Sequence, residues 1–201
     1  MNDASIKNTS IKNSAGDSTI IWDALIRLSH LSYIILLPSL YWTATQGMMD
    51  IHQYLGISLL SIVTIRIFWG FFGSRTSRFS SFITSPKVVL EYSRSFFNRN
   101  SKHFNTHNPM GGYMVIVMLL LLLLQGGLGL FATDDIIFEG PLAHFVSYDL
   151  SVELTGWHHT LFDYILAAII CHILAVIWYQ FYKRQALVQA MIHGKKPKVD
   201  Q

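Results

Sequence analysis

The chain has 201 residues, of which 51% are hydrophobic and only 13% are charged, and its formal net charge is +3. This composition excludes a water-soluble globular protein, because the chain contains long apolar stretches. A helix of ~20 apolar residues crosses the ~30 Å hydrocarbon layer of a bilayer. The net charge itself identifies no partner, so the location of the charges along the chain matters more.

Four membrane-spanning helices follow a polar N-terminal segment. Residues 1–20 are rich in Ser and Asn and lack the apolar stretch of a cleavable signal peptide, so we predict a disordered cytoplasmic tail. Trp22 and Trp42 flank the first span, as aromatic residues do at membrane interfaces. The predicted spans cover residues 26–45, 51–72, 112–131 and 158–182.

The distribution of Lys and Arg predicts the orientation of these spans. Basic residues precede the first span, fill the connection between the second and third, and follow the fourth. Residues 46–50 and 133–157 contain no Lys or Arg and carry Asp and Glu instead. We therefore predict an all-α, integral membrane four-helix bundle with both termini in the cytoplasm. Its membrane domain covers residues 21–185, and residues 186–201 form a basic cytoplasmic tail.

The basic connection is predicted to contain a helix of its own. Ser85 and Pro86 form a helix start signal, with Pro at the first helical position. Apolar residues then recur at helical spacing among basic ones, which predicts an amphipathic helix lying on the inner leaflet. Its apolar positions are Val88, Val89, Tyr92, Phe96 and Phe97.

Histidines inside the spans indicate a functional site, because ionisable side chains are costly in a bilayer. His158 and His172 are 14 residues apart on the fourth span. This spacing places them on nearly the same helix face, ~21 Å apart along the axis. His159 points ~140° away from His172, so His158 is the better candidate. Two imidazoles that far apart cannot share one metal ion, so each needs a partner on another helix.

The alternating direction of the spans supplies these partners. His52 opens the second span on the outer side, level with His158, and His30 lies in the inner half with His172. Two His pairs at two depths, each bridging two helices, predict two b-type haems in the bundle core. A single membrane histidine more often serves packing or a hydrogen bond. Four membrane histidines that form two pairs at two depths favour haem ligation instead.

Further residues suit the same prediction. Arg27, one turn before His30, and Arg66, 14 residues beyond His52, are candidates to contact haem propionates. Gly56, one turn after His52, would allow a macrocycle to approach the backbone. In the third span, Gly126, Gly127 and Gly129 would allow the same approach. Alternative roles remain open. Arg66 would extend to the inner surface, and the glycines of the third span would serve close contacts between helices.

The chain resembles the bacterial cytochrome b561 family, which includes the b-type cytochrome subunits of nickel–iron hydrogenases. The resemblance covers most of residues 22–196 and includes the spacing of His158 and His172. It departs locally at Leu31, where an aromatic residue is common, and at His159, where an acidic one is common. The matching stretches are WDALIRLSH (22–30), RIFWGFFGSRTSRFSSF (66–82), HNPMGG (107–112) and QALVQAMIHGKK (185–196).

The resemblance implies a four-helix, di-haem cytochrome of the bacterial inner membrane with His30, His52, His158 and His172 as ligands. It would exchange electrons between the quinone pool and a redox partner, such as a periplasmic cytochrome c or an associated hydrogenase or dehydrogenase. A superoxide-oxidising quinone reductase is an alternative. A histidine-lined proton or metal transporter is an alternative of another class, with Asp163 its only candidate carboxylate in the spans.

Overall fold

Four long helices form most of the structure, a computed structural model that describes residues 18–20, 22–94, 108–134 and 136–197. They are α1 (Ala24–Thr45), α2 (Met49–Phe72), α4 (Pro109–Gly129) and α5 (Tyr148–Ile177), which the π-helical turn η3 (Trp178–Tyr182) continues. All four are long and apolar enough to cross a membrane, which confirms the predicted all-α bundle of four spans. Shorter elements lie at the ends of the bundle: α3 (Pro86–Arg94), α6 (Leu187–His193), η1 (Phe79–Ser81), η2 (Ala143–Phe145), β1 (Ser18–Ile20) and β2 (Lys195–Pro197).

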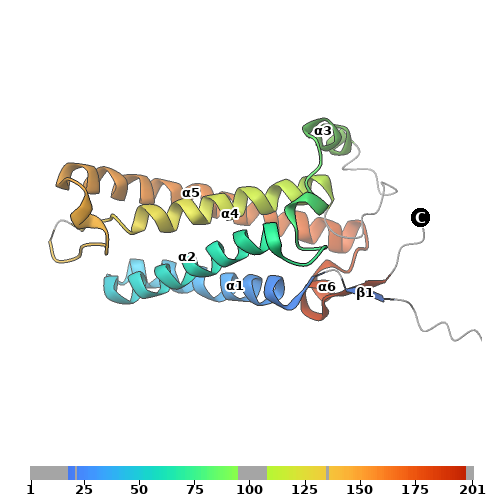
Figure 1. Ribbon diagram of the computed structural model, residues 1–201, viewed down its shortest axis with the longest axis horizontal. Helices are drawn as coiled ribbons and strands as arrows, with labels where there is room; N and C mark the ends of the chain where they lie inside the picture. The colour runs from blue at the N-terminus through green and yellow to red at the C-terminus, as the bar shows by residue number, and fades with distance from the viewer. Residues whose placement is uncertain (1–17, 21, 95–107, 135, 198–201) are drawn as a thin grey trace, which may run out of the picture.

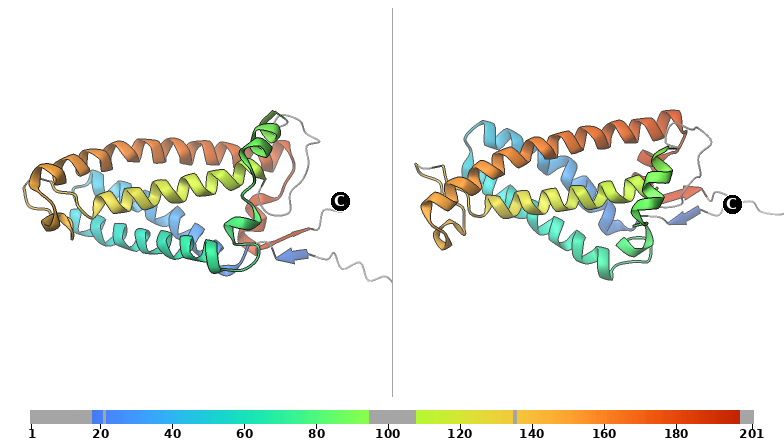
Figure 2. Two further views of the ribbon diagram at one scale, coloured as in Figure 1. Left: turned by 45° about the horizontal axis from the view of Figure 1, so that its top comes forward. Right: turned by 90° about the horizontal axis from the view of Figure 1, so that it is seen from above.

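The long helices alternate in direction along the bundle axis (Figure 1). The closest backbone packing joins α1 to α2, α2 to α4, and α4 to α5. Between α1 and α5 the described contacts are made by side chains, such as the stacked rings of Tyr41 and Phe162, 5.6 Å apart. Two turned views show the same arrangement (Figure 2). The buried core lies mainly between α2 and α4, where Leu59, Val63, Leu119 and Leu122 meet.

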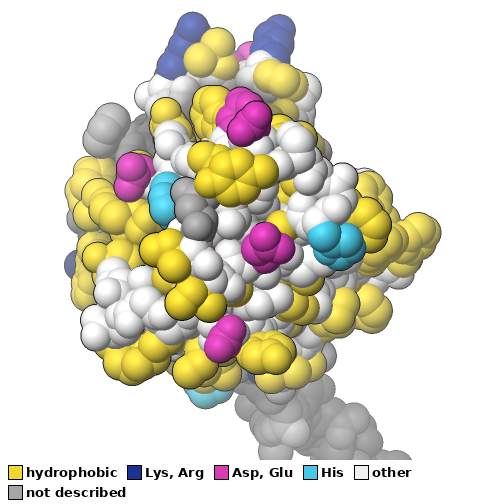
Figure 3. Space-filling view, turned by 90° about the vertical axis from the view of Figure 1, so that its left-hand side faces the viewer, with side chains coloured by type: hydrophobic (Ala, Val, Ile, Leu, Met, Phe, Trp, Pro, Cys, Tyr) yellow, Lys and Arg dark blue, Asp and Glu magenta, His cyan; other side chains and the backbone are white. Residues whose placement is uncertain are grey.

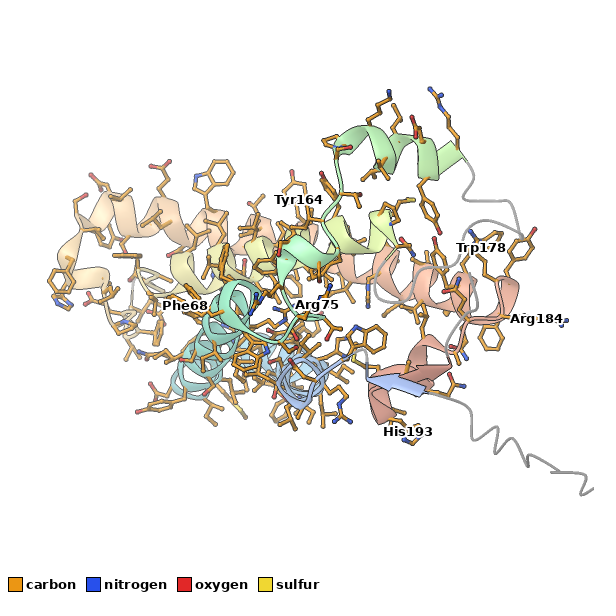
Figure 4. All side chains as sticks on the ribbon, turned by 45° about the vertical axis from the view of Figure 1, so that its right-hand side comes forward. Phe68, Arg75, Tyr164, Trp178, Arg184 and His193 are labelled. Carbon is orange, nitrogen blue, oxygen red and sulfur yellow. The ribbon has the colours of Figure 1, made fainter. Side chains whose placement is uncertain are left out.

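The two ends of the bundle differ in charge. At one end, here called the acidic end, the described charged residues are Asp50, Asp134, Glu139, Asp149 and Glu153. Figure 3 looks onto this end and shows acidic side chains among apolar ones. The opposite, basic end carries Arg75, Arg78, Lys87, Arg94, Lys183 and Arg184. Figure 4 brings the basic end forward, with Arg75, Arg184 and His193 labelled.

Large apolar side chains cover the outside of the bundle. Leu28, Phe68 and Phe72 are 63%, 61% and 79% exposed, and many others along the long helices are similar. A surface of this kind is unfavourable in water, where contiguous apolar patches are small. It suits a hydrocarbon environment and follows from the apolar sequence of the spans.

Helix α5 begins ten residues before the predicted start of the fourth span. Its N-cap is Ser147, whose side chain accepts a hydrogen bond from the Leu150 N–H. Asp149 and Glu153 lower the hydropathy of the first turns of α5. The apolar stretch from which the span was predicted therefore begins later than the helix. As a result His158 lies inside the helix, almost three turns from its start, rather than at its end.

The predicted helix of the basic connection is present as α3. Figures 1 and 2 show it running across the bundle axis at the basic end. Tyr92 anchors it to the end of the fourth span, because its hydroxyl lies 3.1 Å from that of Tyr179, and Lys183 lies over both rings. Burial lowers the pKa of Lys183. Phe96, Phe97 and Arg99, also expected in this helix or beside it, lie outside the described residues.

The chain ends meet at the basic end. Residues placed in tails by the sequence form β1 and β2, which pair antiparallel with Ser18 opposite Pro197. Helix α6 packs beside them, and its Ala190 contacts Trp22 and Ile26 at the start of α1. This arrangement, here called the terminal clasp, fixes the first turn of α1, one turn before His30.

Candidate functional site

The first histidine pair lies toward the acidic end and joins α2 to α5. The rings of His52 and His158 have centroids 6.3 Å apart and planes inclined by 80°. Both side chains are half-buried, whereas the neighbouring His159 is exposed. The structure therefore brings His158, and not His159, opposite His52.

Backbone carbonyl groups hold both rings of this acidic-end pair. His52 Nδ1 lies 3.0 Å from the carbonyl oxygen of Leu40, and His158 Nδ1 lies 2.9 Å from that of Gln125. Because a carbonyl oxygen only accepts, each Nδ1 carries the proton and each Nε2 keeps a lone pair. Hydrogen bonding of this kind fixes the tautomer and orientation of metal-binding histidines.

Helix α4 leaves space for the His158 ring at Gly129. A Cβ atom at this position would lie 2.9 Å from His158 Cε1, closer than side chains normally approach. Gly126 serves a different contact, because a Cβ there would meet Leu60 of α2. At Gly127 a Cβ would meet nothing within 4 Å. Of the three glycines, therefore, Gly129 is the one that accommodates the histidine.

The second pair lies toward the basic end and joins α1 to α5. The rings of His30 and His172 have centroids 6.3 Å apart and planes inclined by 61°. Both side chains are half-buried. Neither ring makes a hydrogen bond to any other residue that the structure describes, in contrast to the first pair.

A buried arginine accompanies the basic-end pair. Arg66 is only 4% exposed, with its guanidinium 5.5 Å from the centre of the Phe79 ring, so it does not reach the surface. Its Nη1 is a buried donor with no hydrogen-bond partner among the described residues. The buried hydroxyl of Tyr33, one turn after His30, interacts electrostatically with Arg66. The Nη1 of Arg66 is available for an anionic ligand.

Asp23 connects the helices beneath this pair. Its Oδ1 caps α1 at the Ile26 N–H, and its Oδ2 accepts from Trp69 Nε1 at 2.8 Å, Ser74 Oγ at 2.7 Å and Ser77 Oγ. Burial raises the pKa of Asp23, but these hydrogen bonds outweigh burial and lower its pKa to about 2. The carboxylate is therefore ionised and fixes the start of α1 to the end of α2.

The remaining predicted site residues are Arg27 and Gly56. Arg27 donates from Nη1 to the carbonyl oxygen of Ile192, 2.8 Å away, so it supports the terminal clasp. Its Nε is buried and has no partner among the described residues. Gly56 has room for a side chain: of the described residues, a Cβ there would meet only Leu40 Cδ2, at an ordinary contact distance of 3.9 Å.

A comparison with known families decides which class of protein this is. The model of the family described as prokaryotic cytochrome b561 matches residues 21–194. The chain belongs to the prokaryotic cytochrome b561 family. It is a membrane b-type cytochrome of electron transfer, and the family implies that it binds haem b. The searches of curated proteins and of solved structures find no match.

The side chains of this b561-family protein fit haem b. Among the described residues no group of three or more His, Cys, Asp or Glu gathers as a metal-ion site, whereas histidines pair twice. A haem needs only axial protein ligands, because the macrocycle supplies the others. Its propionates are anionic, and the unpartnered Arg66 Nη1 is a donor suited to them.

Sequence reasoning missed two residues of this site. Gln125 contacts His158 and is the only polar side chain within an apolar run of the third span, which is a recognisable signal. Asp23 stands directly before the first span, where its type is typical of a helix N-cap. Its other partners are 46 to 54 residues away, so no local pattern reveals them.

Proposed function

We propose that this chain is a di-haem cytochrome that transfers electrons between the quinone pool and a redox partner in the respiratory chain of a bacterial inner membrane. Both termini lie in the cytoplasm in this proposal. The basic end is then cytoplasmic and the acidic end faces the other side of the membrane, in agreement with the preference of Lys and Arg for cytoplasmic loops.

The ring separation carries this proposal. An imidazole nitrogen binds a metal ion at ~2.0–2.1 Å. In a five-membered ring with bonds of ~1.33 Å, each nitrogen lies ~1.1 Å from the ring centre. Two imidazoles on one iron therefore have centres about 6.3 Å apart. Both His30–His172 and His52–His158 have this separation, 6.3 Å, and each pair joins two helices. The rings of His158 and His159 are also 6.3 Å apart, but these two residues are neighbours on one helix and His159 is exposed.

Each remaining residue has a role in this proposal. His52 and His158 would present Nε2 to one haem, and His30 and His172 would hold the other. Arg66 would neutralise a propionate near the basic end, Arg27 would supply a second cation there, and Gly56 would leave room for the macrocycle near His52. Bound haem supplies reversible one-electron chemistry at its iron. The protein fixes the two levels at which this chemistry occurs.

The redox partner beyond the membrane is proposed to dock at the acidic end. This end carries Asp50, Glu139, Asp149 and Glu153, which would steer a basic partner such as a cytochrome c. An associated hydrogenase or dehydrogenase subunit is the other partner class. Electron transfer to a soluble basic partner is expected to slow as salt rises, whereas a stable subunit complex would be recovered in detergent.

The test is haem quantification per chain, combined with reduced-minus-oxidised spectra, on the wild type, His52→Ala, His172→Ala and the control His159→Ala. We expect two b-type haems per wild-type chain and per control chain, and about one in each of the other two variants. One haem in the wild type would refute the di-haem proposal. A variant that loses both haems would refute the independent pairing of the ligands.

Two alternatives gain no support from particular contacts. A transporter needs an interior carboxylate, and Asp163 is exposed on α5. A superoxide-oxidising quinone reductase would use the same histidines, so only activity of the purified chain separates it from the proposed cytochrome.

A further inference from the structure

Gln125 is a polar residue at an unfavourable place. It follows an apolar run, residues 114–124, in a membrane-spanning helix and lies about one turn before the end of that helix. Its Oε1 is buried and has no hydrogen-bond partner among the described residues. A buried amide oxygen without a partner is destabilising. Packing between helices does not require such a group, since a leucine would fill the same volume.

Gln125 contacts His158 through both its backbone and its side chain. The backbone carbonyl accepts the Nδ1–H of His158 at 2.9 Å. The side-chain Nε2 lies 3.0 Å from the His158 backbone oxygen and 3.2 Å from His158 Nε2. Because both of these atoms accept, the amide NH₂ group donates to each of them. One residue therefore controls both ring nitrogens of a proposed ligand.

We propose that Gln125 is a positioning residue of the acidic-end haem site that also sets the reduction potential of that haem. This inference rests on the di-haem function proposed above. The carbonyl fixes which ring nitrogen of His158 carries the proton, and the amide donates to the Nε2 lone pair that a haem iron would bind. The amide keeps its bond to the His158 backbone oxygen, so its dipole and free Oε1 stay beside the ligand.

The amide presents its NH₂ group, the positive end of its dipole, to His158. This disfavours the oxidised haem, which carries one more positive charge than the reduced form. Local polarity and hydrogen bonding are established determinants of haem potential. Replacing the amide by an apolar group should therefore lower the potential of the acidic-end haem. The basic-end haem, held by His30 and His172, has no contact with Gln125 and should not change.

The experiment is a redox titration of both haems in the purified full-length protein, for the wild type, Gln125→Leu and Gln125→Asn. The leucine variant keeps the backbone carbonyl and removes the amide. We expect its acidic-end redox equilibrium to shift at least tenfold toward oxidation, which is ~59 mV for a one-electron couple. Gln125→Asn, which retains an amide one methylene shorter, should shift less. The low-spin ferric EPR signal, which reports the relative orientation of the two ring planes, should change for the acidic-end haem alone.

The basic-end haem is the internal control. Loss of the acidic-end haem alone in Gln125→Leu, with the basic-end spectrum intact, would also support the positioning role. Unchanged potentials in both variants would overturn the inference, as would an equal shift of both haems, because that pattern indicates a general structural change. If the wild type binds fewer than two haems, the proposed function fails instead, so the two failures are distinguishable.

Discussion

The two histidine pairs have the same ring separation but different surroundings. At the acidic end, backbone carbonyls of Leu40 and Gln125 hold both rings, and Gly129 gives one of them room. At the basic end, His30 and His172 have no hydrogen-bond partner among the described residues, but the ionised Asp23 and the buried Arg66 lie near. The comparison indicates that one site is specified by hydrogen bonds and steric fit, and the other by charge and by the anchoring of its helices.

The largest effect expected from this difference concerns Arg66. Arg66→Leu should abolish most binding of the basic-end haem, because the proposed propionate loses its buried cation. The acidic-end haem should be retained, and the haem-free protein should be as stable as the wild type or more so, since an unpartnered buried donor is removed. Haem quantification per chain, together with spectra that resolve the two haems, measures the occupancy of each site. Equal loss of both haems would contradict the assignment of Arg66 to one site.

The second prediction concerns Asp23, which anchors α1 below His30. Asp23→Asn should destabilise the protein by ~1.5–3 kcal/mol at neutral pH, because hydrogen bonds to a charged acceptor are lost. Thermal unfolding in detergent measures the difference. The basic-end haem should be lost at lower temperature than the acidic-end haem in this variant.

The pH dependence of the Asp23 contribution has a definite sign. The pKa of Asp23 is lowered in the folded protein from its ordinary value of 3.8 to about 2. The stabilisation is therefore fully present above pH 3.8 and is lost as the pH falls through about 2. The difference in melting temperature between wild type and Asp23→Asn should narrow over this interval. A constant difference would show that the charge is not responsible.

The third prediction tests the steric fit at the acidic end. Gly129→Ala should displace the His158 ring, at a cost of ~1–3 kcal/mol from overpacking, and weaken the acidic-end haem. Gly127→Ala is the matched control, because a Cβ there meets nothing within 4 Å and the helix is the same. Haem occupancy and ferric EPR measure the effect. Similar behaviour of the two variants would contradict the role of Gly129.

The smallest effect is expected at Gly56. Without haem, Gly56→Ala should stabilise α2 by ~0.5–1 kcal/mol, as alanine does inside helices, because the only near atom is Leu40 Cδ2. With haem bound, a macrocycle lying against Gly56 would collide with the added methyl group. This would oppose the gain in stability and lower the affinity of the acidic-end site for haem. Gly156→Ala, also unobstructed, is the control for the gain alone. Unchanged haem affinity in Gly56→Ala would remove Gly56 from the site.

The sequence allowed prediction of the features that repeat along a helix. The four spans follow from apolar length, and the juxtaposition of His30 with His172 follows from the 14-residue spacing and alternating helix direction. The start of α5 was missed because its first turns carry Asp149 and Glu153, so only the Ser147 cap marks it. Residues 187–193 were expected in a tail because a helix of seven residues, two of them the polar Gln189 and His193, gives little hydropathy signal.

The supports of the histidines could not be predicted for a different reason. Every residue has a backbone carbonyl group. The amino-acid sequence therefore does not reveal that the carbonyl oxygens of Leu40 and Gln125 accept hydrogen bonds from His52 and His158. Such contacts depend on the rotation and axial offset of neighbouring helices, which tertiary packing sets. The same holds for Asp23, whose partners come from the end of α2 and the following loop.

The terminal clasp has a consequence for biosynthesis. During synthesis, which begins at the N-terminus, both histidines of the acidic-end pair are present once residue 158 has been added. The basic-end pair is complete only later, when His172 has been added. Asp23 joins the first turn of α1 to α2 early, but the contact with the terminal clasp forms only after Ala190 reaches Trp22. Because contacts distant in sequence form late, the acidic-end site is expected to form first, and a chain that stops before α6 should hold its basic-end site less firmly than its acidic-end site.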